Sequence, residues 1–305
     1  MTIDRPTPAD NGSSGNLLRD KLARREFFLA PGLHDMMAAV IARDMGFDVV
    51  YGSGYWLTAS CLGLPDAGIA TYTQMRERMA TLKTTVGRAA LIADADTGYG
   101  GKLNVHHTVR GYEDAGVAAI QLEDQEFPKR CGHLPGKRVI PMSDMVDKIR
   151  VAAEARRDPA SMLIIARTDA RQIEGVDGAL RRADAYGKAG ADILFVEAPL
   201  DEEEMRRICR SSALPMMANM SDGGRTPIRS AAELEDIGYA GAIFPAATAL
   251  AANAAVEKML HLLKESGTSQ SPDIPLYDFD RFTRQIGFEE VWALEKHWES
   301  TTTGE

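Results

Sequence analysis

The sequence predicts an α/β protein with the fold of a (β/α)8 barrel of the TIM type. Eight short apolar runs recur along the 305 residues, and each is followed by a longer segment with helical periodicity. Several of the helical segments end in a glycine directly before the next apolar run. Glycine in that position closes a helix in the left-handed conformation. Eight such units fit a barrel, which typically needs roughly 250 residues.

The eight apolar runs are the predicted strands. Most of them are apolar without alternation, as expected for parallel strands that are covered on both faces. They span residues 27–32, 47–54, 89–96, 117–124, 162–169, 192–199, 215–220 and 241–246. A doubly wound open sheet is the alternative, but no GxGxxG pattern follows the first run, and this favours the barrel.

The predicted organisation is one barrel with extensions at both ends. We expect a mobile segment over 1–17, the barrel over 18–265, a helical extension over 266–299 and a tail over 300–305. The extension carries more apolar residues than the outer ring of one barrel requires, namely Phe288, Val291, Trp292, Leu294 and Trp298. Such a helix either folds back on its own barrel or packs on a second subunit.

Composition and charge exclude several classes of partner. The net charge of −9 argues against nucleic acid or an anionic membrane surface. No apolar run approaches the roughly 20 residues that a membrane span needs. Three cysteines without CxxC spacing predict neither a disulfide framework nor a zinc site. With its polar first residues, which do not resemble a signal peptide, the chain is predicted to be cytoplasmic.

Acidic side chains at two strand ends predict a metal site. Asp94 and Asp96 are one residue apart, so on a strand they project to the same side, and Glu123 ends the next strand. Carboxylates without histidine or thiolate partners suit Mg²⁺ or Mn²⁺. The competing interpretation is that these acids cap the following helices. Because barrel active sites lie at the C-terminal strand ends, three acids in this region favour the metal.

Two further features indicate an anionic ligand and a reactive thiol. Arg167 ends an otherwise apolar strand, where it either pairs with a buried acid such as Glu197 or binds a ligand carboxylate. The loop "FPKRCGHLPGKRVI" over 127–140 places Cys131 beside Lys129, Arg130 and His133. Cations near a thiol favour its thiolate form.

These motifs together resemble the isocitrate lyase/phosphoenolpyruvate mutase superfamily. The resemblance rests on "KRCGH" (129–133), "LEDQ" (122–125), "DADTGYG" (94–100), "GLPDAG" (63–68), "IIARTDA" (164–170) and "ANMSDGGRTP" (218–227). They occur in order over most of the chain. The Cys-Gly-His loop is the most specific and is typical of the lyase-type branch, which includes methylisocitrate lyases, dimethylmalate-type lyases and petal-death-protein-like enzymes.

The resemblance implies an assembly, a metal and a set of site residues. It implies C-terminal helices exchanged between subunits in a dimer of dimers, hence a homotetramer, and Mg²⁺ with Mn²⁺ as the alternative. Asp94 and Asp96 would bind the metal, with Glu123 reaching it through water and Asp66 in the outer shell. The remaining residues would bind the substrate, a dicarboxylate or 2-oxo acid: Ser53, Gly54, Tyr55, Gly132, Arg167, Glu197, Asn219 and Ser221.

The chemistry implied is cleavage of a 2-hydroxy dicarboxylate between C2 and C3. The products are a 2-oxo acid and an enediolate that must be protonated. Cys131 would supply that proton as general acid, with His133 among the cations that favour its thiolate. Tyr51 would assist at the substrate hydroxyl, and Glu123 completes the predicted catalytic set.

Departures from the family pattern favour a particular substrate. Leu250 and Phe279 stand where methylisocitrate lyases carry arginines, and Pro245 and Ala246 stand where oxaloacetate hydrolases place a serine. A 2-alkylmalate or 2,3-dimethylmalate remains, with Trp56 joining Leu250 and Phe279 in an apolar wall. The alternatives are methylisocitrate lyase, oxaloacetate hydrolase, a carboxyphosphonoenolpyruvate mutase-like enzyme of P–C bonds, and a non-catalytic metabolite-binding barrel.

Overall fold

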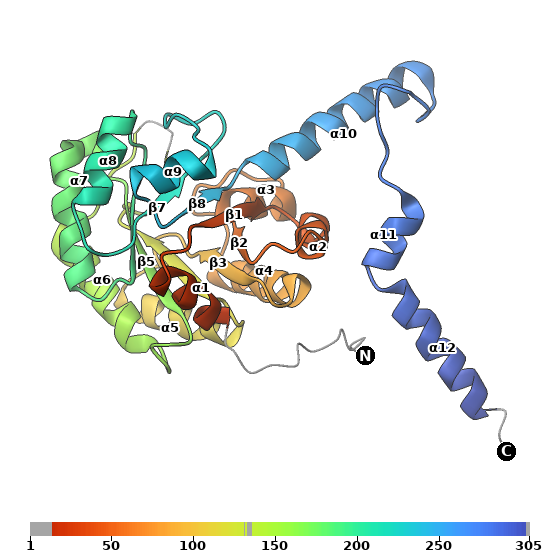
Figure 1. The fold of residues 1–305 in the computed structure, drawn as a ribbon, viewed down its shortest axis with the longest axis horizontal. Helices are drawn as coiled ribbons and strands as arrows, with labels where there is room; N and C mark the ends of the chain where they lie inside the picture. Colours follow the sequence, from red (N-terminus) through yellow and green to blue (C-terminus); the bar gives the residue numbers. More distant parts are fainter. Residues whose placement is uncertain (1–13, 131, 133–135, 303–305) are drawn as a thin grey trace.

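Eight parallel strands form a barrel in the computed structural model, which describes residues 14–130, 132 and 136–302 (Figure 1). The strands follow one another around the barrel in the order β6-β5-β4-β3-β2-β1-β8-β7. A parallel bridge between Leu194 and Met216 brings the two ends of this sheet together. The strands are β1 (Phe28–Leu33), β2 (Val49–Gly52), β3 (Ala90–Asp94), β4 (Ala119–Glu123), β5 (Leu163–Thr168), β6 (Ile193–Val196), β7 (Met217–Asn219) and β8 (Gly241–Phe244). The predicted fold class is confirmed.

Helices surround this barrel, and glycines end several of them as the sequence predicts. Gly46, Gly116, Gly190 and Gly238 all adopt positive φ before a strand, a conformation that glycine reaches without steric cost. The barrel helices are α2 (Met36–Asp44), α3 (Gly54–Leu62), α4 (Tyr72–Val86), α5 (Lys102–Asp114), α6 (Met142–Ala155), α7 (Arg171–Lys188), α8 (Glu202–Arg210) and α9 (Ala231–Ile237).

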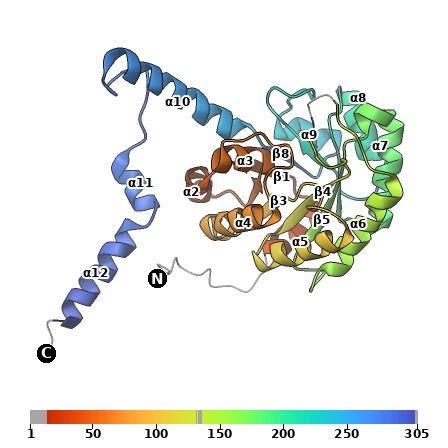
Figure 2. The ribbon, with the colours of Figure 1, turned by 180° about the vertical axis from the view of Figure 1, so that it is seen from behind.

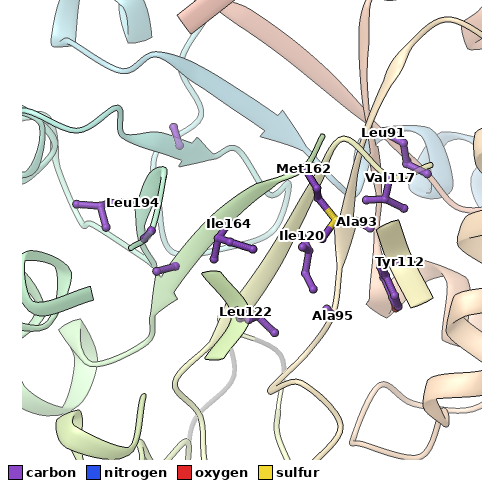
Figure 3. Packing of buried hydrophobic residues seen from close by; sticks show 14 of the residues in the cluster. Leu91, Ala93, Ala95, Tyr112, Val117, Ile120, Leu122, Met162, Ile164 and Leu194 are labelled. Atoms are coloured by element: carbon purple, nitrogen blue, oxygen red, sulfur yellow. The ribbon is translucent and has the colours of Figure 1, made fainter. Parts of the chain in front are cut away.

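The apolar core has two layers, because successive residues of a strand point to opposite faces. One layer lies between strands and helices and includes Leu91, Ile120, Ile164 and Leu194 (Figure 3). The other fills the barrel interior and includes Ile92, Ala119, Ile165 and Phe195. The interior residues have a fixed parity, and this parity decides which polar residues at the strand ends face the barrel axis.

One end of the barrel is covered by a short helix, α1 (Ser14–Ala23). Its Leu18 is fully buried among the interior residues. Arg19 Nε donates to the carbonyl of Ala160, just before β5, and Lys21 pairs with Asp48, just before β2. These contacts lie where the strands begin, so α1 covers the N-terminal end and leaves the C-terminal strand ends open.

The C-terminal helices extend away from the barrel (Figures 1 and 2). They are α10 (Ala247–Ser266), α11 (Phe279–Gln285) and α12 (Phe288–Thr302). A hydrogen bond from Arg43 to the carbonyl of Gln285, at 2.7 Å, joins α11 to α2. Large apolar side chains are exposed along this C-terminal arm, among them Leu260, Phe279, Phe288, Trp292 and Trp298. In this chain α12 therefore does not fold back over the barrel.

None of the helices in the described part of the chain is both long enough and apolar enough to cross a membrane.

Candidate active site

A pocket of about 310 Å³ opens at the C-terminal ends of the strands. The strand parity explains which side chains reach it. Along β3, Ala90 and Ile92 face the interior, and Asp94 is the next residue on that side. The same count places Glu123, Arg167 and Glu197 after the interior residues of β4, β5 and β6.

Most of the predicted site residues meet in this pocket. Its lining includes Tyr51, Ser53, Tyr55, Asp66, Asp94, Glu123, Gly132, Arg167, Glu197, Asn219 and Ser221. Gly54 and Asp96 lie directly behind it, since the Gly54 amide donates to Asp94 Oδ2 at 3.2 Å and the Asp96 amide donates to Asp94 Oδ1 at 3.0 Å. Cys131 and His133 lie outside the described residues, but Arg130 and Gly132, the neighbours of Cys131, line the pocket.

The predicted apolar wall is only partly present within one chain. Trp56 and Leu250 line the pocket, as do Pro245 and Ala246. Phe279 does not belong to that lining: it lies on α11 with 79% of its surface exposed. Any contribution of Phe279 to a pocket would therefore involve a second copy of the chain.

Four carboxylates and one ammonium form an acidic cluster on one side of the pocket. Lys129 Nζ pairs with Asp66 and lies 2.6 Å from Asp96 Oδ1, and all three side chains are buried. Asp94 and Glu123 complete the cluster. Burial lowers the pKa of Lys129, but the acids around it outweigh burial and raise that pKa well above its ordinary value. Lys129 therefore stays charged.

One ammonium does not neutralise four carboxylates. Burial raises the pKa of Asp96 to about 7; Lys129 opposes this rise, and Asp94 and Asp66 add to it. Burial likewise raises the pKa of Glu123 well above its usual range, against the opposing charge of Arg167. Like charges close together in a buried site are unfavourable, so the acidic cluster favours a further cation or protons.

Arg167 lines the pocket next to the acidic cluster and contacts three carboxylates. Its guanidinium lies 3.2 Å from Glu197 Oε2, 3.5 Å from Glu123 Oε2 and 2.9 Å from Asp169 Oδ2. Asn219 Nδ2 donates to both carboxylate oxygens of Glu197, at 3.1 and 3.3 Å. The pairing of Arg167 with Glu197, one of the two interpretations of this arginine, is present.

Tyr51 lines the pocket, close to both Asp94 of the acidic cluster and Arg167. Burial raises the pKa of its phenol well above the ordinary value, and the nearby Asp94 adds to this rise. Tyr51 therefore keeps its proton, and its hydroxyl accepts a hydrogen bond from Gln121 Nε2 at 3.3 Å. It can donate to a ligand oxygen, but it is not a ready base.

Comparison with known proteins identifies the family. The phosphoenolpyruvate phosphomutase family model matches residues 18–264. The chain belongs to the PEP mutase/isocitrate lyase superfamily. It is 43% identical over 281 residues to a 2,3-dimethylmalate lyase of Eubacterium barkeri, covering 92% of this chain and 96% of that protein. It is also 43% identical to a 2-methylisocitrate lyase of Aeropyrum pernix, covering 90% and 87%.

Solved structures of the superfamily support the same assignment. A crystal structure of 2,3-dimethylmalate lyase superposes with a TM-score of 0.88 at 34% identity, covering 94% of this chain and 96% of that one. A phosphonopyruvate hydrolase, solved in complex with oxalate and Mg²⁺, superposes with a TM-score of 0.83 at 29% identity, covering 93% and 99%.

The acidic cluster fits the divalent metal that this superfamily implies. Its donors are all carboxylate oxygens, the ligands that Mg²⁺ and Mn²⁺ prefer. Glu123 Oε1 is buried without a hydrogen-bond partner in the described part of the chain. Among the same residues, no three acidic, histidine or cysteine side chains already converge in ligating geometry. Lys129 instead lies against two of the acids, so the observed arrangement is that of a site holding an internal cation.

Sequence reasoning missed two residues of this superfamily member. Gln121 faces the interior by strand parity, which was a usable signal. Lys137 lies in the same loop, over 127–140, as Cys131, and its ammonium bonds both the Gly132 carbonyl and Asp169. Nothing in its residue type or spacing distinguishes it from an exposed lysine.

Proposed function

We propose that this protein is a metal-dependent carbon–carbon lyase that cleaves a 2-hydroxy dicarboxylate of the 2-alkylmalate or 2,3-dimethylmalate type. The observation that carries the proposal is that one pocket combines the acidic cluster, the Arg167 guanidinium and an apolar wall that includes Trp56 and Leu250. The named activities of the relatives, dimethylmalate lyase and methylisocitrate lyase, agree with this class of reaction.

Each part of the pocket is assigned one task. Asp94 and Asp96 would hold Mg²⁺, with Glu123 reaching it through water and Asp66 in the outer shell. When bound, the metal would stabilise negative charge on the oxygens of the 2-oxo acid half. Arg167 would bind the carboxylate of that half. The other groups proposed to hold the substrate are the backbone and side chains of Ser53, Gly54, Tyr55, Gly132, Glu197, Asn219 and Ser221.

Proton movements are assigned to three residues. Tyr51, which keeps its proton, donates a hydrogen bond to the substrate hydroxyl oxygen. Burial raises the pKa of Glu123, so this carboxyl can hold the proton that the hydroxyl releases. The electrons of the C2–C3 bond then pass into the departing carboxylate, and the Cys131 thiol protonates the carbon of the enediolate. His133 and Arg130 would favour the thiolate that remains, whereas the Lys129 ammonium pairs with Asp66 and Asp96.

The apolar wall selects the substrate. Leu250 and Trp56 line the pocket, and we assign them to the place where a tricarboxylate would need a cation for its third carboxylate. Leaving a carboxylate unpaired against apolar groups is costly. A substrate with an alkyl substituent at that position avoids the cost.

A substrate panel tests the proposal. Purified protein with Mg²⁺ would be offered 2,3-dimethylmalate, 2-ethylmalate, methylisocitrate, oxaloacetate and phosphonopyruvate. We expect cleavage of an alkylmalate to a 2-oxo acid, lost when EDTA removes the metal. Turnover of methylisocitrate alone would mean that the apolar wall was misinterpreted, and turnover of phosphonopyruvate alone would move the protein to the phosphonate branch.

Two cysteine substitutions test the proposed role of Cys131 as general acid. Cys131→Ser should lower kcat by about 10²- to 10⁴-fold, the usual range for a positioned proton donor. Cys209→Ser is the matched control. Cys209 lies on α8, outside the pocket lining, and burial raises the pKa of its thiol to about 12, so it is unreactive near neutrality. Equal activity of the two variants would remove Cys131 from the mechanism.

A further inference from the structure

We propose that Lys137 is a positioning residue that sets the orientation of Arg167 and its availability to a ligand carboxylate by holding Asp169. The inference rests on the proposed function, because it concerns the carboxylate-binding side of the same pocket. Lys137 itself does not line that pocket, and it acts through its partners.

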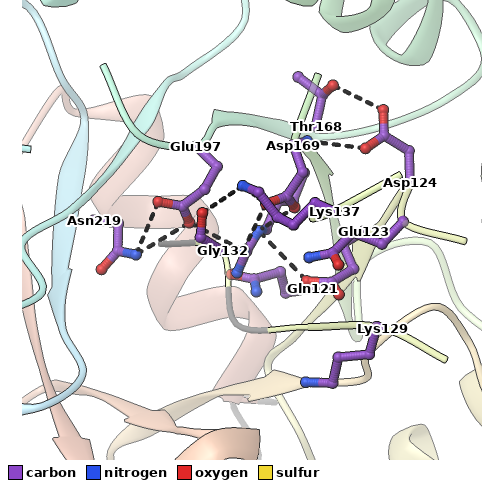
Figure 4. A network of polar contacts seen from close by, with 12 residues as sticks. Gln121, Glu123, Asp124, Lys129, Gly132, Lys137, Thr168, Asp169, Glu197 and Asn219 are labelled. Atoms are coloured by element: carbon purple, nitrogen blue, oxygen red, sulfur yellow. Dashed lines mark hydrogen bonds and ion pairs between the residues drawn. The ribbon is translucent and has the colours of Figure 1, made fainter. Parts of the chain in front are cut away.

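The first observation is that Lys137 is buried and fully engaged. Its side chain is 2% exposed, and its ammonium lies 2.8 Å from Asp169 Oδ1 and also donates to the Gly132 carbonyl (Figure 4). Lysines are almost never fully buried unless they are paired, because a desolvated ammonium is costly. A lysine placed here therefore has a specific electrostatic partner, and that partner is Asp169.

The second observation is that Asp169 joins two cations. Its Oδ1 is 2.8 Å from Lys137 and 3.1 Å from Arg167 Nη2, while its Oδ2 accepts from Arg167 Nε at 2.9 Å. Burial alone would raise the pKa of Asp169, but Arg167 and Lys137 outweigh burial and lower it to about 2. The carboxylate is thus ionised and binds the guanidinium through two hydrogen bonds, from Nε and from Nη2.

The third observation is that Asp169 has a rigid base. Its amide donates to Asp124 Oδ1 at 2.9 Å. Asp124 is fully buried and accepts hydrogen bonds from Tyr186 and Thr168, both at 2.7 Å, and from Arg182 at 3.3 Å. This network holds the backbone of Asp169 and leaves its carboxylate with Lys137 and Arg167 as partners, so the loss of Lys137 acts on Arg167, which faces the pocket.

Charge balance gives the direction of the effect. Arg167 is surrounded by three carboxylates, those of Asp169, Glu123 and Glu197. With Lys137 present, Asp169 shares its negative charge between two cations. Without it, the guanidinium alone would have to balance Asp169 in a buried site, and less of its positive potential would remain for a ligand carboxylate.

Lys137 also bonds the backbone of Gly132, a second group that contacts Arg167. A Cβ added at Gly132 would overlap the Arg167 guanidinium, so the backbone of Gly132 packs directly against it. Lys137 fixes this backbone through the Gly132 carbonyl, and Gln172 Nε2 adds only a long hydrogen bond of 3.4 Å. Lys137 therefore restrains Arg167 from two directions.

Binding of a simple dicarboxylate tests the inference without requiring turnover. Oxalate would be titrated into the full chain with Mg²⁺ by calorimetry. We expect Lys137→Met to weaken oxalate binding by roughly ten- to a hundredfold, the usual effect of losing a buried hydrogen bond to a charged group. Lys137→Arg keeps the charge and should recover part of the affinity. Lys102→Met is the control, since Lys102 pairs with Asp147 at the surface and is 63% exposed.

Kinetics and a double substitution separate positioning from general damage. With the preferred substrate, Lys137→Met should raise KM while kcat changes less than threefold, because carboxylate binding by Arg167 serves substrate and transition state alike. If Lys137→Met does not fold, Asp169→Asn and Asp169→Asn/Lys137→Met are compared, since neither contains a buried carboxylate at position 169 that has lost Lys137. On the Asp169→Asn background, Lys137→Met should then weaken oxalate binding by much less than the roughly tenfold expected when Asp169 is present.

The failures are distinguishable. If the unaltered protein does not bind oxalate with Mg²⁺, the proposed function fails first. If it binds and Lys137→Met binds equally well, the positioning role of Lys137 is overturned. That role is also overturned if kcat falls and KM does not change. It is overturned as well if Lys137→Met weakens oxalate binding by roughly ten- to a hundredfold even on the Asp169→Asn background.

Discussion

At the scale of single residues, the acidic side of the pocket depends on the absence of a side chain at Gly54. The Gly54 amide donates to Asp94 Oδ2, and a Cβ at this position would lie 2.7 Å from the same oxygen. Real Cβ atoms essentially never approach that closely, so the carboxylate would have to move. Gly54 therefore sets where Asp94 can point.

Gly54→Ala should weaken metal binding. We expect at least a tenfold loss of Mn²⁺ or Mg²⁺ affinity, measured by calorimetry, because the displaced carboxylate is one of the two proposed direct ligands. Gly101→Ala is the matched control: a Cβ there meets only Asn104, at 4.0 Å, and its φ of −80° suits alanine. Unchanged metal affinity in Gly54→Ala would separate Asp94 from the metal.

Strand parity predicts the site residues at strand ends, whereas loop residues such as Asp66 and Gly132, which also line the pocket, were assigned only through the family resemblance. Asp94, Glu123 and Arg167 could be assigned to one pocket because strand parity and the C-terminal strand ends determine their direction. Lys129 and Lys137 lie in the loop over 127–140, on either side of Cys131 in the sequence, and both ammoniums pair with buried acids. No local pattern encodes that pairing, since a lysine in a loop is usually exposed.

At the scale of secondary structure, local sequence determined most elements. The eight apolar runs coincide with the eight strands to within about three residues at each end. Capping explains helix starts as well: Thr71 and Gln74 form a capping box at α4, and Ser230 and Glu233 form one at α9. The start of α7 was harder to foresee, because Gly175, at φ 72°, interrupts the helix close to its first residue.

The cap of α9 makes a direct stability prediction. Ser230 Oγ accepts from the Glu233 amide at 3.3 Å, and Glu233 Oε2 accepts from the Ser230 amide at 2.8 Å. Ser230→Ala should lower the free energy of unfolding by about 1 kcal/mol, measured by urea denaturation. Catalytic activity should not change, because α9 contributes nothing to the pocket lining. If Ser230→Ala lost activity under conditions where the variant is fully folded, the prediction that this cap affects stability alone would be wrong.

Lys83, near the end of α4, predicts how the stability of the protein depends on pH. Burial lowers the pKa of Lys83 to about 8, and its ammonium donates to the carbonyls of Gly87 and Ala89 at 2.6 and 3.0 Å. The unfolded chain binds the proton up to an ordinary lysine pKa near 10.5. The unfolded state therefore binds more protons between about pH 8 and 10.5, and stability from this group rises with pH in that window.

The pH dependence predicted for Lys83 is checked by comparing the stability of the unaltered protein with that of Lys83→Met. Urea midpoints of the two would be measured from pH 7 to 9.5. The unaltered protein should gain stability relative to the variant as pH rises through 8, whichever is more stable at pH 7. A constant difference across the range would show that Lys83 keeps its ordinary pKa in the folded state.

At the scale of the whole molecule, the C-terminal arm is not accounted for by one chain. Its amphipathic pattern was visible in the sequence, but the choice between folding back and packing on another subunit was not, since both bury the same side chains. In the structure the arm stands off the barrel, Phe279 is 79% exposed and Trp292 is 52% exposed. Apolar surface of this extent usually marks an interface.

We propose that a second copy of the chain covers the arm, so the protein should be at least a dimer in solution. Two observations indicate a second copy as the partner. The arm exposes several aromatic side chains, and one of them, Phe279, is predicted to belong to the apolar wall but does not line the pocket of its own chain. Sedimentation should therefore give a mass of at least twice the 33.2 kDa of one chain. Trp292→Glu places a charge in this surface and should shift the protein toward the monomer, because burying an unpaired carboxylate is costly.

The same substitution can show whether association serves the pocket. Glu295→Gln, on the same helix, is the control, because it changes charge without removing apolar surface. If the partner supplies Phe279 to the apolar wall, monomeric Trp292→Glu should lose affinity for an alkylmalate but retain its affinity for oxalate, which has no alkyl group to contact the wall. A monomer with full alkylmalate affinity would make the arm a purely structural connection, and a monomeric unaltered protein would rule out the second copy altogether.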